Sequence, residues 1–171
     1  MQDCYSSKVE KVAVYPGSFD PITWGHIDIL KRSLCIFEKV IIAVNNTPSK
    51  KFLFSFDERV KMIKEVLNKE KINSRVEIKE LKGLLVDFLK INNVKVVIRG
   101  LRVVSDFEYE FRMAWANKKL WKDIEMIYFF SSEKYTFLAS TIVKEVANLG
   151  GDLSCFVPKY IEKYIKEKFK K

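Results

Sequence analysis

Apolar runs of strand length alternate along this chain with amphipathic stretches of helical period. Residues 12–15 and 40–44 are apolar at every position, which is typical of parallel strands that are covered on both faces. Between them, residues 26–37 carry apolar side chains at helical spacing and charged side chains on the other faces. Strand, helix and strand in this order predict a βαβ unit with a right-handed crossover.

The same alternation continues toward the end of the chain. Further strands are predicted over residues 76–80, 94–98 and 124–130, and further helices over 55–68, 84–91 and 105–120, with one more ending at Gly150-Gly151 and a last one beginning at Pro158. Ser55 with Glu58, and Ser105 with Glu108, have the spacing of a capping box, so we expect a helix to begin at each pair.

This order of elements predicts an α/β fold. We expect a doubly wound, Rossmann-like sheet of five parallel strands with helices on both faces. A chain of 171 residues is of single-domain length. The domain should occupy residues 11–171, including a C-terminal amphipathic helix, and residues 1–10 should form a disordered tail. In such sheets, ligands bind beyond the carboxyl ends of the strands, near the switch in strand order.

The charge of the chain bears on its partners. A formal charge of +9 favours an anionic partner, either nucleic acid or a small phosphorylated ligand. Residues 159–171 alone supply +4, from six lysines and two glutamates, and a solvated helix face explains them more simply. No apolar run approaches bilayer length and the first residues lack a secretion signal, so we expect a cytoplasmic protein with no membrane partner.

Cysteine and histidine usage restricts the chemistry. Cys4, Cys35 and Cys155 lie far apart and never as Cys-x-x-Cys, which argues against a disulfide framework or a zinc site. His26 is the single histidine, so a site that needs two imidazoles is excluded. We therefore expect no metal ion held by protein ligands.

The loop after the first strand is the strongest chemical signal. Residues 16–26 read Pro-Gly-Ser-Phe-Asp-Pro-Ile-Thr-Trp-Gly-His, a Gly/Pro loop that leads from a strand into a helix. Backbone N–H groups at a helix start have no partners, so this loop and the His26 imidazole could together bind phosphate. Alternatively, a backbone carbonyl satisfies His26. The P-loop and Gly-x-Gly-x-x-Gly motifs are absent, which disfavours P-loop ATPases and nicotinamide-dependent dehydrogenases.

Polar and charged residues follow most of the predicted strands. The candidates at these strand ends are Ser18, His26, Lys50, Leu84, Leu85, Arg99–Arg102 and Tyr135–Thr141. Arg99 continues an apolar strand, so it either faces an anionic ligand or pairs with an acidic residue of a neighbouring element. Lys50 either binds the same ligand or is a solvated loop lysine.

Residues 15–26 resemble the signature of the nucleotidyltransferase superfamily, with Tyr-Pro-Gly-Ser-Phe-Asp-Pro followed by Thr-x-Gly-His. Residues 49–51, 98–110 and 140–146 narrow the resemblance to the bacterial phosphopantetheine adenylyltransferase family. That family transfers the adenylyl group of ATP to 4′-phosphopantetheine, giving 3′-dephospho-coenzyme A and pyrophosphate in coenzyme A biosynthesis. The resemblance implies Mg²⁺ bound mainly through the ATP phosphates, a homohexamer, and coenzyme A as feedback inhibitor.

The resemblance also assigns roles to individual residues. His26, Lys50 and Arg99 would be catalytic, with His26 stabilising the transition state at the α-phosphate. Phosphopantetheine would be held by Ser18, Lys50, Leu85 and Arg99. ATP would contact Ser18, Phe19, His26, Gly100, Leu101, Arg102, Glu110, Tyr135, Thr136, Phe137, Leu138, Ala139, Ser140 and Thr141.

Two other functions stay open from the sequence. A sister adenylyl- or cytidylyltransferase, acting on nicotinate mononucleotide or a small phosphorylated alcohol, would use the same signature residues; Lys50 and residues 99–102 and 109–110 favour phosphopantetheine. A basic nucleic-acid-binding module depends mainly on the net charge. The chain shows neither interleaved aromatic and basic residues nor a recognition helix, so we expect no nucleic-acid partner.

Overall fold

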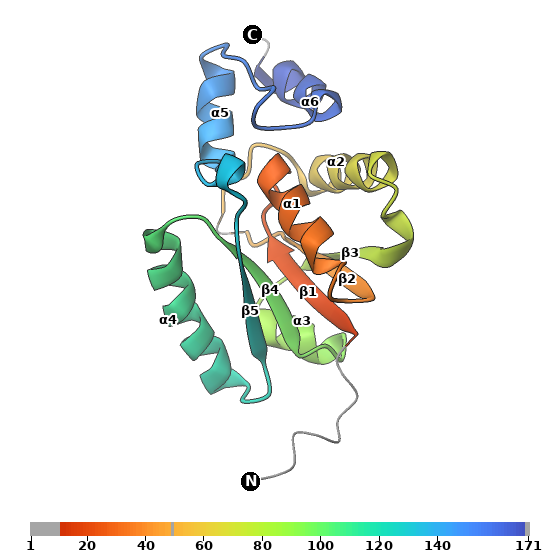
Figure 1. Cartoon of the computed structure of the whole chain (residues 1–171), viewed down its shortest axis with the longest axis vertical. Coiled ribbons are helices and arrows are strands. Elements are labelled where there is room, and N and C mark those ends of the chain that lie inside the picture. Colours follow the sequence, from red (N-terminus) through yellow and green to blue (C-terminus); the bar gives the residue numbers. More distant parts are fainter. Residues whose placement is uncertain (1–10, 49, 170–171) are drawn as a thin grey trace.

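The computed structural model describes residues 11–48 and 50–169 and shows one parallel β-sheet with helices on both faces (Figure 1). Its strands are β1 (Val12–Gly17), β2 (Lys39–Asn45), β3 (Val76–Leu81), β4 (Val96–Leu101) and β5 (Glu125–Phe130). They follow the order β3-β2-β1-β4-β5, so the direction of winding switches between β1 and β4. The predicted five-stranded sheet is confirmed, whereas the tail predicted over residues 1–10 lies outside the described residues.

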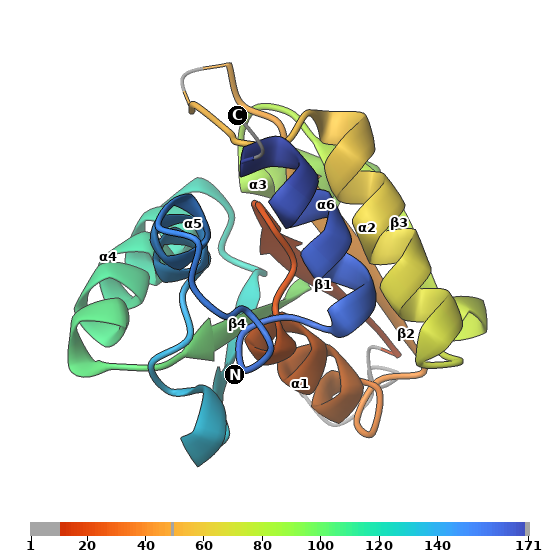
Figure 2. The same cartoon turned by 90° about the horizontal axis from the view of Figure 1, so that it is seen from above.

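The helices form two layers. In the described part of the chain they are α1 (Trp24–Ser33), α2 (Phe56–Lys69), α3 (Leu85–Ile91), α4 (Val104–Leu120), α5 (Ser140–Asn148) and α6 (Lys159–Phe169), with short 3₁₀ turns η2 (Asn73–Arg75) and η3 (Glu133–Tyr135). Side chains from α1, α2, α5 and α6 share one apolar core with the sheet, and α3 shares the core on the other face. α6 lies beside α2 (Figure 2), where the Tyr164 hydroxyl donates to Glu65.

The central strands owe their continuous apolar pattern to this double cover. Along β1, Ala13 and Tyr15 face the core shared with α1, while Val14 faces the core shared with α3. Strand β2 likewise alternates between the two cores, with Ile41 on one face and Ile42 on the other. Polar loops at the carboxyl ends of these strands are thereby held on a rigid base.

Several element boundaries differ from the sequence prediction. α1 begins two residues earlier than predicted, at Trp24, because the Thr23 side chain caps it, and it ends four residues earlier, at Ser33. β4 extends to Leu101, so Arg99 lies within the strand rather than beyond it. The capping box predicted at Ser105 and Glu108 is wrong, since α4 starts at Val104 and has no side-chain cap. The box at Ser55 and Glu58 is confirmed.

The lysine-rich end of the chain forms a solvated helix face. Ile161 and Ile165 of α6 are fully buried in the core. On the exposed face of the same helix, Lys163 forms an ion pair with Glu65 of α2, and Lys168 forms one with Glu58 of α2. Part of the positive charge is thus neutralised within the molecule. No helix in the described residues is long and apolar enough to span a bilayer.

Candidate active site

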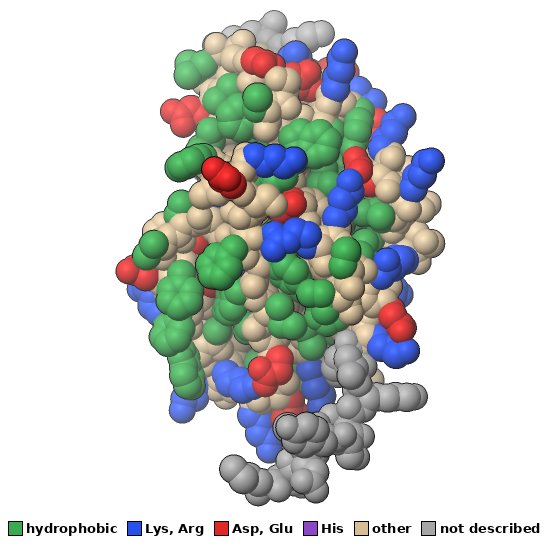
Figure 3. Space-filling model, in the orientation of Figure 1, with side chains coloured by type: hydrophobic (Ala, Val, Ile, Leu, Met, Phe, Trp, Pro, Cys, Tyr) green, Lys and Arg blue, Asp and Glu red, His purple; other side chains and the backbone are tan. Residues whose placement is uncertain are grey.

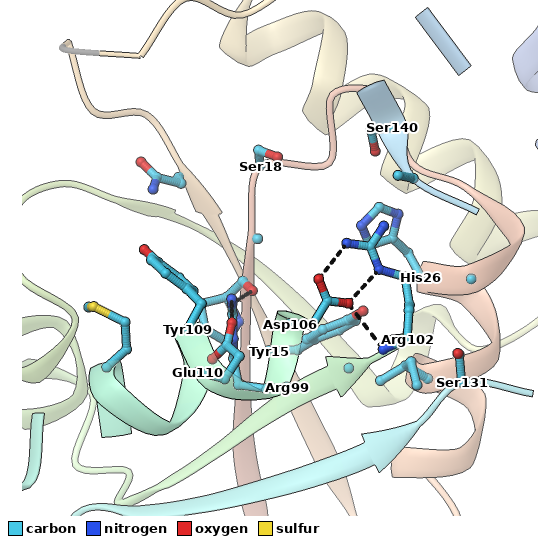
Figure 4. Close-up of a pocket in the computed structure, with 18 of the residues that line it drawn as sticks. Tyr15, Ser18, His26, Arg99, Arg102, Asp106, Tyr109, Glu110, Ser131 and Ser140 are labelled. Carbon is cyan, nitrogen blue, oxygen red and sulfur yellow. Dashed lines mark hydrogen bonds and ion pairs between the residues drawn. The ribbon is translucent and has the colours of Figure 1, made fainter. Parts of the chain in front are cut away.

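A pocket of about 620 Å³ lies at the carboxyl ends of the strands, where the winding switches between β1 and β4 (Figure 4). It brings together fourteen of the residues predicted from the sequence: Ser18, His26, Lys50, Leu84, Leu85, Arg99, Gly100, Arg102, Glu110, Tyr135, Leu138, Ala139, Ser140 and Thr141. These residues come from six separate segments of the chain, so the fold itself assembles the site.

Four predicted residues do not line the pocket: Phe19, Leu101, Thr136 and Phe137. Phe19 and Leu101 are buried in the core, so any contact that they make with a ligand here has to come from the backbone. The Phe19 ring packs beneath Gly17, where a Cβ would come within 2.9 Å of it. Phe19 therefore shapes the loop from below.

His26 is held by the residue that caps its helix. The backbone N–H of Thr23 donates to His26 Nδ1 at 3.1 Å, and the Thr23 hydroxyl lies 2.9 Å from the same nitrogen. Because a backbone N–H can only donate, Nδ1 is an acceptor and the proton of the neutral ring is on Nε2. The alternative that the sequence leaves open is that a backbone carbonyl accepts a hydrogen bond from His26. At Nδ1 the partner is a backbone N–H and not a carbonyl.

The surroundings of His26 keep its ring uncharged. Burial, together with the positive charges of Arg102 and Arg99, lowers the pKa of His26 from its usual 6.5 to about 4. At neutral pH the imidazole is therefore a neutral Nε2–H donor beside two cations, an arrangement suited to an anionic ligand.

Arg99 is fixed by an acidic residue of α4. Its Nε donates to Glu110 at 2.9 Å, a second nitrogen also donates to the Glu110 carboxylate, and the third donates to the Pro16 carbonyl at 2.8 Å. The ion pair predicted as one alternative for Arg99 is confirmed, and the guanidinium also lines the pocket, so contact with an anionic ligand stays a prediction. Within residues 11–48 and 50–169, three of its five N–H groups are used in these hydrogen bonds.

Arg102 is hydrogen-bonded both to α4 and to the segment that follows β5, residues 131–141. Asp106, four residues later on α4, accepts from the backbone N–H of Arg102 and from its guanidinium at 3.0 and 3.1 Å. The same guanidinium donates to the Leu138 carbonyl at 3.2 Å, and the Ser140 hydroxyl donates to the Pro21 carbonyl at 3.0 Å. The segment from Ser131 to Thr141 is therefore tied to the His26 loop.

Several pocket residues were not predicted from the sequence. They include Thr23, Asn45, Asp106, Tyr109, Met113, Asn117 and Met126. Asn117 is only 7 % exposed and lines the pocket from the last turn of α4. The i, i+4 spacing of Arg102 and Asp106 is a signal that could have revealed that pair, whereas Asn117 has no such signal.

The side chains of the pocket show whether the protein itself could hold a metal ion. In residues 11–48 and 50–169, no three His, Cys, Asp or Glu side chains are grouped so that they could hold a metal ion. The two carboxylates that line the pocket, Asp106 and Glu110, are each engaged by an arginine. A cation at this site would therefore need ligands from the bound molecule.

Comparison with known proteins gives a consistent result. The cytidylyltransferase-like family model matches residues 14–146. The chain is 51 % identical over 161 residues to the phosphopantetheine adenylyltransferase of Caldanaerobacter subterraneus subsp. tengcongensis, covering 94 % of this chain and 99 % of that protein. It is also 51 % identical to the phosphopantetheine adenylyltransferase of Dictyoglomus thermophilum, covering 92 % and 94 %.

Among solved structures, the nicotinic acid mononucleotide adenylyltransferase of Plasmodium falciparum, complexed with NaAD, is similar with a TM-score of 0.67. The match covers 91 % of this chain and 94 % of that one, at 18 % identity. At this identity the likeness concerns the fold alone.

Two matched variants distinguish the contact of Thr23 with His26 from its role as a helix cap. We expect Thr23→Ala and Ser55→Ala each to lower the free energy of unfolding by about 1 kcal/mol, because each removes a helix cap. Only Thr23→Ala should raise the pKa of His26, since the Thr23 hydroxyl contacts Nδ1 of the neutral ring. Urea unfolding and an NMR pH titration of the single histidine measure the two effects. Identical His26 titration in both variants would contradict this role of Thr23.

Proposed function

The chain belongs to the phosphopantetheine adenylyltransferase family, and from that premise we propose that it transfers the adenylyl group of ATP to 4′-phosphopantetheine. A phosphate oxygen of the acceptor forms a new bond to the α-phosphorus of ATP. The bond from that phosphorus to the bridging oxygen of the β-phosphate breaks, and pyrophosphate leaves. The products are 3′-dephospho-coenzyme A and pyrophosphate.

One arrangement supports this proposal: residues assigned to both substrates line a single pocket. In Figure 4, His26, Arg102 and Ser140 of the ATP set lie on one side, Arg99 of the acceptor set and Tyr109 lie on the other, and Ser18 lies between them. Glu110, also assigned to ATP, pairs with Arg99. ATP on the first side and the acceptor on the second would therefore meet with their phosphates near Ser18. An in-line transfer requires this juxtaposition of phosphates.

The chemistry that this chain must supply is mainly positioning and charge stabilisation. The attacking phosphate is already anionic, so a strong general base is not needed. The neutral His26 donates from Nε2, and its donor would stabilise charge that develops on the α-phosphate. The N-terminal end of α1 adds its positive dipole at the same point.

The pocket lining also offers charged, apolar and amide groups that suit phosphopantetheine. Lys50 and Arg99 would hold its phosphate. Leu85 and Met113 would offer apolar contact to the pantetheine arm, and the amide of Asn117, which lines the pocket, could bond to the amide groups of that arm. We further propose that Mg²⁺ enters with ATP, held mainly by the phosphates, where it would neutralise their charge.

Pyrophosphate release distinguishes the candidate acceptors. We expect the purified protein with magnesium-ATP to release pyrophosphate when 4′-phosphopantetheine is added and to release far less with nicotinate mononucleotide or phosphocholine, because these lack the arm that Leu85 and Met113 contact. ATP alone serves as the blank. Release with nicotinate mononucleotide but none with phosphopantetheine would replace the proposal by the sister activity.

We also propose that the chain assembles as a homohexamer, and α4 supplies the structural support. This helix buries Glu110 and Asn117 while Phe107, Phe111 and Trp115 are half exposed in a row, at 50, 51 and 58 %. Figure 3 shows hydrophobic side chains gathered along this edge of the molecule. An exposed apolar stripe of this size is typical of a surface that a protein partner covers.

Light scattering tests the assembly. We expect a mass of about six times the 20.1 kDa of one chain. The double variant Phe111→Glu/Trp115→Glu should lower that mass, because it places charges in the stripe. Ile36→Glu, at an exposed apolar residue outside α4, is the control and should keep the mass of the wild type. A wild type with the mass of one chain would contradict the proposal.

Two further properties follow from the proposed reaction. Coenzyme A carries the same pantetheine arm as the acceptor, so we propose that it occupies the acceptor side of the pocket and acts as feedback inhibitor. A cytoplasmic location fits an enzyme that consumes ATP.

A further inference from the structure

Arg59 of α2 is a fully buried arginine beneath the floor of the pocket. Its side chain has 0 % exposure. One guanidinium nitrogen donates to the backbone carbonyls of Ser18 at 2.9 Å and Asn45 at 2.6 Å, and another donates to the Asn46 side chain at 3.2 Å. The same group stacks on the Phe52 ring, 4.1 Å from its centre. A single side chain thus contacts the loops after β1 and β2 and the segment that follows Lys50.

These partners lie at the loops that carry Ser18 and Lys50, two of the residues assigned to phosphopantetheine. Ser18, Asn45 and Lys50 all line the pocket, and Phe52 is two residues beyond Lys50. The Arg59 side chain makes no hydrogen bond or ring contact with His26, Arg102 or residues 131–141 in the described chain. The ATP side is instead tied together by Arg102 and Ser140.

Arg59 differs from most buried arginines because it has no ion-pair partner in the described residues. In the described residues no carboxylate lies within ion-pair distance of it, and its Nε has no hydrogen-bond partner. Asp20 and Glu80 are the nearest opposing charges. A buried cation without a direct ion pair contributes little to stability alone, and here its guanidinium donates to the carbonyl of Ser18, where the acceptor phosphate is expected.

We propose that Arg59 is a positioning residue for the acceptor: it fixes the loops of Ser18 and Asn45 to Lys50 at the spacing that the phosphate of phosphopantetheine requires. This inference rests on the proposed function. Because Arg59 contacts the loops of Ser18 and Asn45 and the segment after Lys50, and makes no hydrogen bond or ring contact with His26, Arg102 or residues 131–141 in the described chain, its loss should weaken the use of the acceptor much more than the use of ATP.

Arg59→Lys tests this role, since it keeps the charge but not the forked set of donors. Loss of charged hydrogen bonds of this kind typically corresponds to about a tenfold change or more. We expect the KM for phosphopantetheine to rise about tenfold and the KM for ATP to change less than about twofold. Phe52→Leu, a milder change that removes the stacked ring, should shift the same KM in the same direction.

Arg75 provides the matched control. It also donates to backbone carbonyls, those of Leu34, Phe37 and Glu38, but at the amino end of β2 and away from the pocket. Arg75→Lys should lower the thermal midpoint while both KM values stay as in the wild type.

The outcomes are distinct. Equal changes in both KM values, or unchanged KM values with a lower thermal midpoint, in Arg59→Lys would overturn the positioning role. If that variant does not fold, Phe52→Leu decides by the same criterion. A wild type that does not use phosphopantetheine would overturn the proposed function instead.

Discussion

The hydrogen bond from the Thr23 backbone to Nδ1 of His26 is the constraint on which the site depends. It belongs to the capping box of α1, so the same contact that starts the helix also sets the tautomer and direction of the imidazole. Burial and two neighbouring arginines keep the ring neutral. A short stretch of sequence thereby supplies a helix start, a donor and a loop at the sheet's switch point that we propose binds phosphate.

The cations around this donor are ordered by carboxylates from α4. Glu110 fixes Arg99 and Asp106 fixes Arg102, which reduces the net positive charge of the pocket below what the arginines alone suggest. In return, both guanidinium groups are held in place before a ligand arrives. Such preorganisation favours transition-state stabilisation over simple charge attraction. The exposed apolar stripe of the same helix links the site to the proposed assembly.

Sequence patterns predicted the parts of the fold that depend on local spacing. β1 and β2 could be predicted because residues 12–15 and 40–44 are apolar at every position, and the Ser55 box because its two residues satisfy one another. The box at Ser105 failed because α4 begins one residue earlier, at Val104, so Ser105 lies inside the helix and not at its cap. The pairing of Arg99 with Glu110 depends on how α4 packs against β4, which local spacing does not show. The burial of Arg59 could not be predicted either, because in the sequence it looks like one charged position of an amphipathic helix. Phe19 was placed at the ligand, yet its ring supports the loop from the core.

The protonation state of His26 tests this account most directly, and a chain with one histidine allows a clean measurement. The folded pKa of about 4 lies below the usual 6.5, so the unfolded chain binds the proton more readily, and acidification through this window should destabilise the fold. Nitrogen-15 NMR of the imidazole at neutral pH should show a proton on Nε2 and none on Nδ1, with protonation only near pH 4. A ring that is charged at neutral pH, or protonated on Nδ1, would contradict the account.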